Sequence, residues 1–211
     1  LSTMIRKLGS YVRPRKAGVS SLNFPAKGRI YPEPYGNVLI FSAWNYPFQL
    51  LFSPFIGAIA AGNCVILKPA EQAPATAEIA AKIVAAVFPP EYASVCNGGH
   101  EMTQELLAEE FDCIFYTGGS AGAKFIARAA AEHFTPLTLE LGGKSPCIVD
   151  ADAKIDLAAK RIVWGKFLNA GQTCVAPDYL LVHKTARDKL LDRLRHWIRT
   201  FYGDNPKNSP D

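Results

Sequence analysis

A cysteine, a carboxylate and an amide along this chain are the side chains best suited to react with a carbonyl group. Cys174 lies in a loop after a predicted helix, within the string Asn169-Ala-Gly-Gln-Thr-Cys. A thiolate is a strong nucleophile, and small neighbours leave it open to a carbonyl carbon. The alternative is a buried free thiol without a chemical role, which is the commonest environment of free cysteine. Cys64, Cys113 and Cys147, in or beside apolar runs, fit that alternative.

Two further polar residues follow predicted strands. Glu140 comes at the end of an apolar strand, where burial would raise the pKa of its carboxyl group toward neutrality and suit it to be a general base. The alternative for Glu140 is a structural salt bridge, for example to Lys144. Asn45 follows the first buried strand. Its amide could donate to a developing oxyanion, or it could cap the next helix.

A glycine-rich turn, Thr117-Gly-Gly-Ser-Ala-Gly122, connects a predicted strand to a predicted helix. Backbone N–H groups and the positive end of the helix dipole at such a turn favour a phosphate. The turn lacks the G-x-G-x-x-G pattern, so by itself it is weak evidence of a dinucleotide site. Lys68 and Glu71 follow the second strand and could hydrogen-bond a ribose, although each is also an ordinary loop charge.

These residues require a scaffold that brings strand ends together. Continuous apolar runs bounded by turn residues predict buried strands at 37–43, 63–68, 92–96 and 113–116. Helical spacing and flanking Pro or Gly predict helices between them, at 49–61, between Pro74 and Pro89, at 101–109 and at 121–132. This alternation predicts an α/β fold with a mostly parallel sheet and helices on both faces.

The pattern changes near residue 140, where two strands, 137–141 and 146–150, follow each other closely. We therefore expect one domain over 1–139 and the first part of another over 140–211. The second contains a predicted helix at 155–167, a strand at 179–183 and a final amphipathic helix. The apolar side of that last helix carries Leu190, Leu191, Leu194, Trp197, Ile198 and Phe201.

Composition excludes several classes of protein. The net charge of +4 is spread along 211 residues without a dense Lys/Arg run, so we expect no nucleic-acid partner. The most apolar stretch, 50–61, is too short to span a bilayer. Five widely spaced cysteines match neither a zinc site nor a disulfide framework, which favours a reducing, cytoplasmic location and no metal. Leu1 begins no signal-like segment, and we expect the chain to be cut from a longer protein.

The strings taken together resemble the aldehyde dehydrogenase superfamily, and most closely its class 3 branch of fatty and aromatic aldehyde dehydrogenases. The resemblance runs from about Tyr31 to Tyr202. Its best-matched strings are Glu33-Pro-Tyr-Gly, Ala43-Trp-Asn-Tyr-Pro-Phe, Gly57-Ala-Ile-Ala-Ala-Gly-Asn, Leu67-Lys-Pro-Ala-Glu, Leu137-Thr-Leu-Glu-Leu-Gly-Gly-Lys-Ser-Pro-Cys, Trp164-Gly-Lys-Phe and Gly171-Gln-Thr-Cys-Val-Ala-Pro-Asp-Tyr. Several long strings in the right order are a specific signal.

This resemblance implies a Rossmann-like cofactor domain and oxidation of an aldehyde to a carboxylic acid with NAD or NADP. Cys174 would be the nucleophile, the Asn45 amide and the Cys174 backbone N–H would hold the oxyanion, and Glu140 would activate the hydrolytic water. The implied cofactor-binding residues are Lys68, Glu71, Gly118, Gly119, Ser120, Gly122, Ala123 and Leu141. The implied partners are an aldehyde substrate and a second copy of the enzyme, as a homodimer.

The sequence departs from the family pattern at several positions, and two other functions fit it. Gly119 replaces the usual Ser or Thr and Ala123 the usual Gly, which affects the expected cofactor affinity. Family members are about twice as long and carry a downstream Glu-x-Phe-Gly-Pro segment, so we expect this piece alone to be inactive. An acylating, coenzyme A-dependent dehydrogenase and a nucleotide-binding module without catalysis are the other hypotheses. Glu71 should disfavour the 2′-phosphate of NADP, yet class 3 relatives often accept both cofactors.

Overall fold

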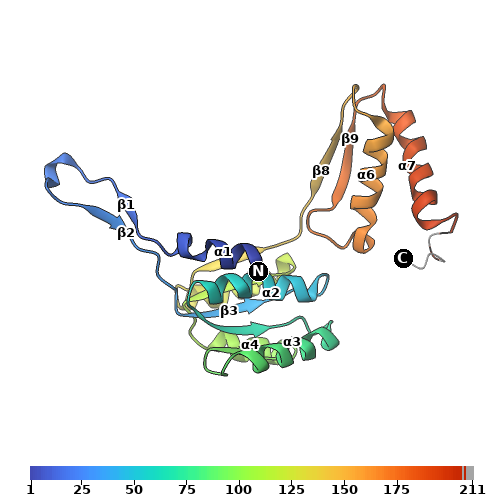
Figure 1. Cartoon of the computed structure of the whole chain (residues 1–211). Coiled ribbons are helices and arrows are strands. Elements are labelled where there is room, and N and C mark those ends of the chain that lie inside the picture. Colours follow the sequence, from blue (N-terminus) through green and yellow to red (C-terminus); the bar gives the residue numbers. More distant parts are fainter. Residues whose placement is uncertain (206, 208–211) are drawn as a thin grey trace. The chain divides into compact units, whose positions relative to one another are not determined.

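Five parallel strands form the sheet of the first compact unit, residues 1–140, in a computed structural model that describes residues 1–205 and 207 (Figure 1). Their order across the sheet is β5-β4-β3-β6-β7. The strands are β3 (Asn37–Phe41), β4 (Cys64–Lys68), β5 (Ala93–Val95), β6 (Cys113–Thr117) and β7 (Leu137–Glu140). From β3 the chain adds β4 and β5 on one side of the sheet. It then crosses to the other side of β3 and adds β6 and β7. The predicted parallel α/β sheet is confirmed.

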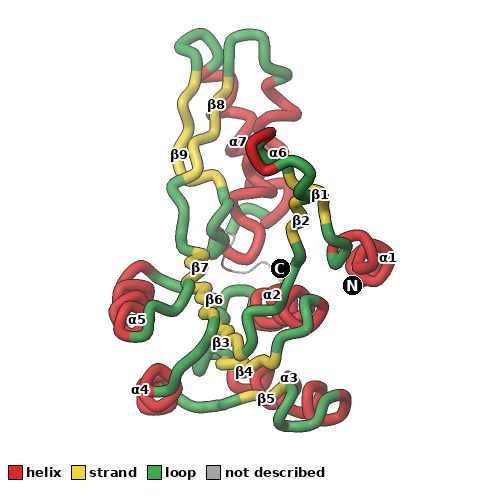
Figure 2. The backbone as a smooth tube through the Cα atoms, turned by 90° about the vertical axis from the view of Figure 1, so that its left-hand side faces the viewer, coloured by secondary structure: helices red, strands yellow, loops and turns green. Residues whose placement is uncertain are grey.

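Helices cover both faces of this sheet (Figure 2). Successive side chains of β3 point to opposite faces, as a strand requires: Val38 and Ile40 belong to one buried cluster, and Leu39 and Phe41 to another. The first cluster is covered by α2 (Pro47–Ala60) and α3 (Pro74–Val87), the second by α4 (His100–Ala108) and α5 (Ser120–Glu132). Because both of its faces are buried, β3 is apolar from Val38 to Phe41 rather than alternating.

Turns at the amino ends of the strands are fixed by polar contacts. Asn63 is buried; its carbonyl oxygen accepts from the Gly36 N–H at 3.0 Å and its amide donates to the Ala58 carbonyl at 2.9 Å. Gly62 ends α2 with a φ of +91°, a conformation that favours glycine. The α2 helix begins at Pro47, two residues before the predicted start, because proline is well suited to the first turn of a helix.

A short helix and a hairpin precede the sheet and were not predicted from the sequence. They are α1 (Ser2–Tyr11), which contacts α2, and the antiparallel strands β1 (Arg15–Ala17) and β2 (Gly28–Ile30), with a 3₁₀ turn, η1 (Ser21–Asn23), between them. Strands of three residues, mostly exposed, lack the apolar run by which a strand is recognised in a sequence.

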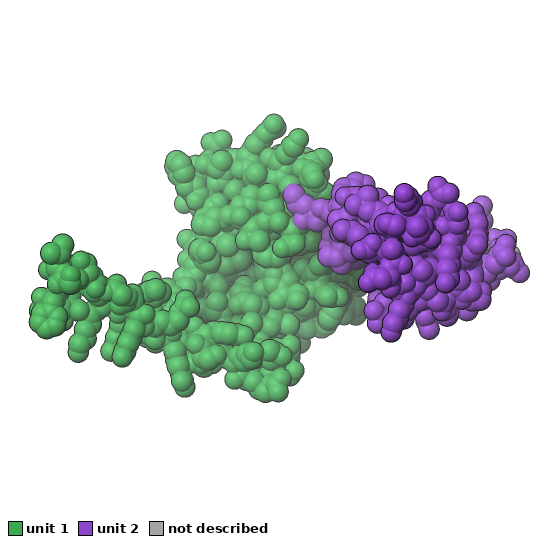
Figure 3. All heavy atoms as spheres, turned by 90° about the horizontal axis from the view of Figure 1, so that it is seen from above, with its two compact units in different colours: residues 1–140 green, residues 141–211 purple. Residues whose placement is uncertain are grey.

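The second compact unit, residues 141–211, is drawn in purple in Figure 3. In it, β8 (Ser145–Val149) pairs with β9 (Pro177–Val182) in parallel. Helices α6 (Ile155–Phe167) and α7 (Arg187–Tyr202) pack against each other. Their core contains Val149, Ile155, Ala159, Ala186 and Leu190. Asp156 of α6 accepts hydrogen bonds from Arg193 and Trp197 of α7, which fixes the helix pair. The side chains of Ile148 and Leu181 remain largely exposed on the strands.

Some general features bear on function. None of the helices within residues 1–205 and 207 is long and apolar enough to cross a membrane. The five cysteines are free thiols, and Cys174 is the exposed one among them. Within the same described residues, no cluster of three His, Cys, Asp or Glu side chains is arranged to hold a metal ion.

Candidate active site

The carboxyl ends of β3, β4 and β6 form the edge of the first unit at which most of the predicted site residues lie. Register pairs Phe41 with Lys68 on one side and with Tyr116 on the other. The Ser42 N–H donates to the Lys68 carbonyl at 3.2 Å, which extends the ladder one residue further. Ligands of open parallel sheets bind at this edge, next to the strand where the connection reverses direction.

Lys68 is the most deeply buried of the predicted site residues that carry a charge, with 5% of its surface exposed. Its ammonium group donates to the Gly98 carbonyl at 2.6 Å and to the Pro69 carbonyl at 3.1 Å. Burial lowers the pKa of Lys68, an effect that the charge of Glu71 opposes. An ammonium group has three N–H bonds, so one donor remains beyond these two contacts.

The Glu71 carboxylate lies beside the loop that follows β5. A Cβ atom built on Gly99 would stand 2.7 Å from its Oε2 atom, so the carboxylate lies close to the backbone there and would have to shift for any larger residue. Gly99 is also the N-cap residue of α4, where a carboxylate is favoured by the helix dipole. Burial raises the pKa of the neighbouring Cys96 thiol, and the Lys68 charge partly opposes that rise. Lys68 and Glu71 are thus brought together with residues 96–99.

The glycine-rich turn after β6 leads directly into α5. The Gly118 N–H donates to the Glu140 carbonyl at 3.0 Å, and the Ala123 N–H donates to the Gly119 carbonyl at 3.0 Å as the first bond of the helix. In helix geometry the N–H groups before Ala123, from Ser120 to Gly122, have no partner within the helix. A Cβ atom on Gly119 would meet nothing within 4 Å, so the outer side of the turn is open.

Asn45 and Ser42 follow β3, the strand that lies between β4, which carries Lys68, and β6, which leads into the glycine-rich turn. Asn45 is half-buried and is not the helix cap, because α2 has Tyr46 at that position. The alternative interpretation of Asn45 as a cap is therefore wrong. The Ser42 hydroxyl is buried without a hydrogen-bond partner among the described residues. Ser42 was not predicted as a site residue, because a serine after an apolar strand gives no signal in the sequence.

Glu140 ends β7, next to Thr117 in the register. The expectation of burial is wrong, because the Glu140 side chain is exposed in this chain. Lys144, named above as a salt-bridge partner for Glu140, pairs with Asp178 at 3.2 Å. The strand that carries Glu140 is at the edge of the sheet, so within the described residues no strand lies on its outer side to bury it.

Cys174 lies in a tight turn of the second unit. The Ala176 N–H donates to the Thr173 carbonyl at 3.1 Å and closes this turn. Before it, Asn169, Ala170 and Gly171 all have positive φ values, between +53° and +77°, a conformation of higher energy for residues with side chains. This reversal follows directly after α6, and the Cys174 side chain is exposed; its reactivity stays a prediction.

Gly143 supports the same turn from the loop before β8. A Cβ atom on Gly143 would collide with the Cys174 carbonyl oxygen, whereas one on Gly142 would meet nothing within 4 Å. The two glycines of the string Leu-Gly-Gly-Lys therefore differ in role, which the sequence alone does not reveal. Leu141, predicted to bind the cofactor, begins this loop and is half-buried.

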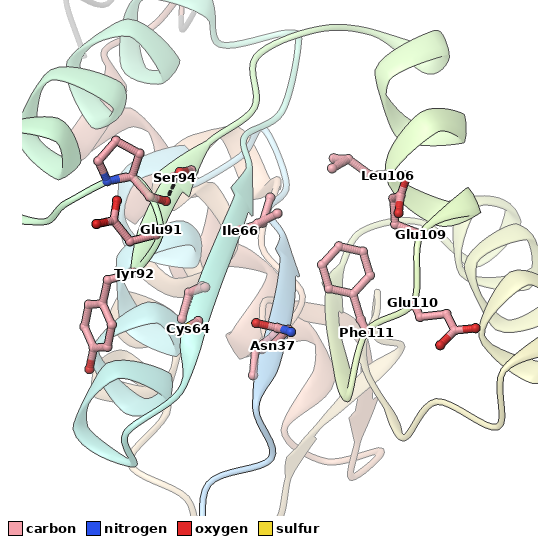
Figure 4. A pocket seen from close by; sticks show the side chains of 13 residues that line it. Asn37, Cys64, Ile66, Glu91, Tyr92, Ser94, Leu106, Glu109, Glu110 and Phe111 are labelled. Atoms are coloured by element: carbon pink, nitrogen blue, oxygen red, sulfur yellow. Dashed lines mark hydrogen bonds between the residues drawn. The ribbon is translucent and has the colours of Figure 1, made fainter.

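The first unit also contains a cavity of about 380 Å³ toward the amino ends of β3, β4 and β5 (Figure 4). Asn37, Cys64, Ile66, Tyr92 and Phe111 are among its lining residues. The predicted catalytic and cofactor-binding residues are absent from that lining, and ligands bind open parallel sheets at the other edge. We therefore place the candidate site at the carboxyl edge.

Comparison with known proteins gives a consistent result. The sequence profile of the aldehyde dehydrogenase family matches residues 6–210. Aldehyde dehydrogenase family 3 member A2 from Macaca fascicularis is 47% identical over 208 residues, which are 99% of this chain and 43% of that protein. The mouse protein named aldehyde dehydrogenase, dimeric NADP-preferring, is 48% identical over 182 residues, 86% of this chain and 40% of that protein.

Solved structures of aldehyde dehydrogenases also resemble this chain. The substrate-bound state of Staphylococcus aureus AldH superposes with a TM-score of 0.93 at 46% identity and covers all of this chain and 46% of that one. Mycobacterium tuberculosis aldehyde dehydrogenase complexed with NAD⁺ has a TM-score of 0.85 at 31% identity and covers 95% of this chain and 41% of that one. The chain spans less than half the length of each of these four relatives.

Proposed function

Because the chain belongs to the aldehyde dehydrogenase family, we propose that it supplies the cofactor-binding half and the nucleophile of an enzyme that oxidises an aldehyde to a carboxylic acid. Family members use NAD or NADP, as the NADP-preferring mouse relative and the NAD⁺ complex of the M. tuberculosis enzyme illustrate. In this proposal residues 1–139 bind the cofactor and residues 140–211 begin the catalytic domain.

The observation that carries the proposal is the arrangement at the carboxyl edge of the sheet. A buried ammonium group with an adjacent carboxylate lies on one side of β3, and a glycine-rich helix start lies on the other. The first group suits the hydroxyls of a ribose and the second suits a pyrophosphate. The unpartnered hydroxyl of Ser42 lies at the end of β3, where a ligand can supply the missing hydrogen bond. These residues fit a nicotinamide dinucleotide, which when bound accepts a hydride.

Cys174 performs the covalent chemistry in this proposal. Its thiolate forms a C–S bond to the aldehyde carbon, and the carbonyl oxygen becomes an oxyanion that the Asn45 amide and the Cys174 N–H stabilise. Loss of the carbon-bound hydrogen as a hydride converts the adduct to a thioester on the same sulfur atom. The exposure of Cys174 supports this role, because an aldehyde must reach the sulfur atom.

Glu140 completes the cycle by taking a proton from water. The resulting hydroxide adds to the thioester carbon, the C–S bond breaks, and Cys174 leaves as a thiolate with release of the carboxylic acid. The position of Glu140 at the carboxyl end of β7 supports this role, since that end of the sheet carries the other predicted groups. If coenzyme A rather than water released the acyl group, the enzyme would be an acylating dehydrogenase.

The resemblance of the sequence to the class 3 branch supports a fatty or aromatic aldehyde as the substrate, and the mouse relative named as dimeric supports a homodimer as the assembly. A cytoplasmic location is part of the same proposal and is supported by five free thiols without a disulfide. Glu71 favours NAD over NADP, because a carboxylate repels the additional 2′-phosphate of NADP.

The test is turnover of the enzyme that contains this chain. Cys174→Ala should lower aldehyde-dependent NADH formation by more than about a thousandfold, because nucleophile removal leaves only binding and polarisation. Cys147→Ala, which removes a half-buried thiol from β8, is the matched control and should keep the activity. An active Cys174→Ala enzyme would refute the mechanism. A requirement for coenzyme A would replace hydrolysis by acyl transfer.

A further inference from the structure

We propose that Tyr116, which has no role in the chemistry above, is a positioning residue that shapes the glycine-rich turn for the cofactor pyrophosphate. This inference rests on the proposed function of the turn. Tyr116 is the second-last residue of β6, and its ring packs against Phe41 of β3 with the two centroids 6.1 Å apart. The phenol therefore projects from the sheet edge toward the turn that begins at Gly118.

The hydroxyl of Tyr116 lies inside this turn. It donates a hydrogen bond of 3.2 Å to the Gly119 carbonyl, the same oxygen that accepts the first helical bond from the Ala123 N–H. Gly119 is the cap residue of α5, and no side chain caps this helix. The phenol thus fixes the carbonyl of the cap residue, so that the N–H groups of the first helical turn keep their direction away from the sheet.

Two glycines make room for the phenol. A Cβ atom on either Gly118 or Gly122 would collide with the Tyr116 hydroxyl. Neither residue has a positive φ, so space rather than backbone conformation requires glycine at both positions. Gly122 is the more informative case, because glycine within a helix is disfavoured relative to alanine and needs a reason.

A Cβ atom on Gly118 would collide with the ring of Tyr116 as well as its hydroxyl, whereas one on Gly122 would collide mainly with the hydroxyl. This difference can be tested. At Gly118 the ring carbon Cζ would stand 2.6 Å from a Cβ atom, whereas at Gly122 Cζ would stand 3.2 Å away. Removal of the hydroxyl alone therefore relieves most of the collision at Gly122 but leaves the collision at Gly118. Tyr116→Phe should rescue Gly122→Ala and should not rescue Gly118→Ala.

The experiment measures NAD⁺ affinity by calorimetric titration and thermal unfolding without cofactor, on the 211-residue chain and on the enzyme that contains it. Tyr116→Phe should weaken NAD⁺ binding about five-fold, the effect of one lost hydrogen bond. Gly122→Ala should weaken it at least as much and should lower the unfolding temperature. The Tyr116→Phe, Gly122→Ala double variant should bind like Tyr116→Phe alone.

Two controls separate positioning from general effects. Gly57→Ala in α2, where a Cβ atom meets nothing within 4 Å, should raise the unfolding temperature and keep the NAD⁺ affinity. Tyr92→Phe removes the hydroxyl of a tyrosine outside the glycine-rich turn and should also leave the NAD⁺ affinity unchanged. Equal NAD⁺ affinity of the unsubstituted protein, Tyr116→Phe and Gly122→Ala would overturn the positioning role alone. No NAD⁺ binding by the unsubstituted enzyme would overturn the proposed function, and this inference with it.

Discussion

The ammonium group of Lys68 donates a 2.6 Å hydrogen bond to the carbonyl oxygen of Gly98, so a buried cation at the end of β4 holds the loop that follows β5. This bond has a structural consequence and a functional one. It ties Gly98, which precedes α4, to the end of β4, and it holds the ammonium group near the edge at which we propose that the ribose binds.

Lys68→Met should therefore reduce both stability and cofactor affinity. The substitution leaves the Gly98 and Pro69 carbonyls without their donor, and we expect the free energy of unfolding to fall by about 1 to 2 kcal/mol. Urea unfolding measures this loss, with Lys82→Met, on the exposed side of α3, as the control. The prediction fails if both variants unfold at the same urea concentration.

The difference between wild type and Lys68→Met should depend on pH. Burial lowers the pKa of Lys68 in the folded chain, so between that lowered pKa and the ordinary value of lysine the unfolded chain binds more protons. Stability then rises with pH in this window. The advantage of wild type over Lys68→Met should accordingly grow as the pH approaches the ordinary pKa of lysine. An advantage that shrinks over the same range would contradict the shift.

Glu71→Gln should change the choice of cofactor. Removing the negative charge removes its repulsion of the 2′-phosphate of NADP, while the amide can still hydrogen-bond a ribose hydroxyl. We expect the ratio of NADP to NAD⁺ affinity to rise several-fold in the enzyme that contains this chain, most clearly at low salt. Glu78→Gln, on α3, is the control for the lost charge. An unchanged ratio in Glu71→Gln would mean that Glu71 does not face the 2′ position.

The cysteines should react with iodoacetamide at different rates at neutral pH. Cys174 is exposed, whereas burial raises the pKa of the Cys96 and Cys113 thiols. A raised pKa leaves less thiolate at a given pH, so we expect Cys174 to be modified first and Cys113 among the last. Peptide mass spectrometry over time measures the order. Lys68→Met should slow Cys96, because it removes the charge that favours its thiolate, and modification of Cys113 before Cys174 would contradict the prediction.

Gly143→Ala should disturb the Cys174 turn, while Gly142→Ala should not. The added methyl group at 143 collides with the Cys174 carbonyl, and at 142 it meets nothing. We expect Gly143→Ala to change the alkylation rate of Cys174 and to lower aldehyde oxidation at least ten-fold, since small displacements of a reacting group are costly. NAD⁺ affinity, measured in parallel, should stay near the wild-type value in both variants. Equal alkylation rates and equal aldehyde oxidation in both variants would show that the close approach of Gly143 to the Cys174 carbonyl is not needed.

The helices and strands that could be predicted are those whose sequence signal is local. The strand over Asn37–Phe41 is apolar because both of its faces are covered, and Pro74 and Gly62 mark helix ends by their own backbone preferences. The hairpin of β1 and β2 was missed for the opposite reason. Its strands are mostly exposed, so no apolar pattern distinguishes them from a loop.

Features that depend on contacts between distant parts of the chain could not be predicted. The exposure of Glu140 follows from the position of β7 at the edge of the sheet, and an apolar sequence alone suggested burial. The roles of Gly118 and Gly122 depend on the position of the Tyr116 hydroxyl in the folded chain, which the spacing of these residues in the sequence does not reveal. A phenol two residues before a glycine-rich turn is nevertheless a signal that could be sought in related sequences.

The order of strands in the sheet has a consequence for how the chain acquires its structure. β3 pairs with β4, which is near in sequence, and with β6, which is synthesised much later; the Asn37 N–H bonds Asp112 across a separation of 75 residues. Pairings between distant segments slow folding because a long loop must close first. During translation one side of the central strand therefore stays unpaired until β6 leaves the ribosome, and in that interval the nascent chain should depend most on chaperones.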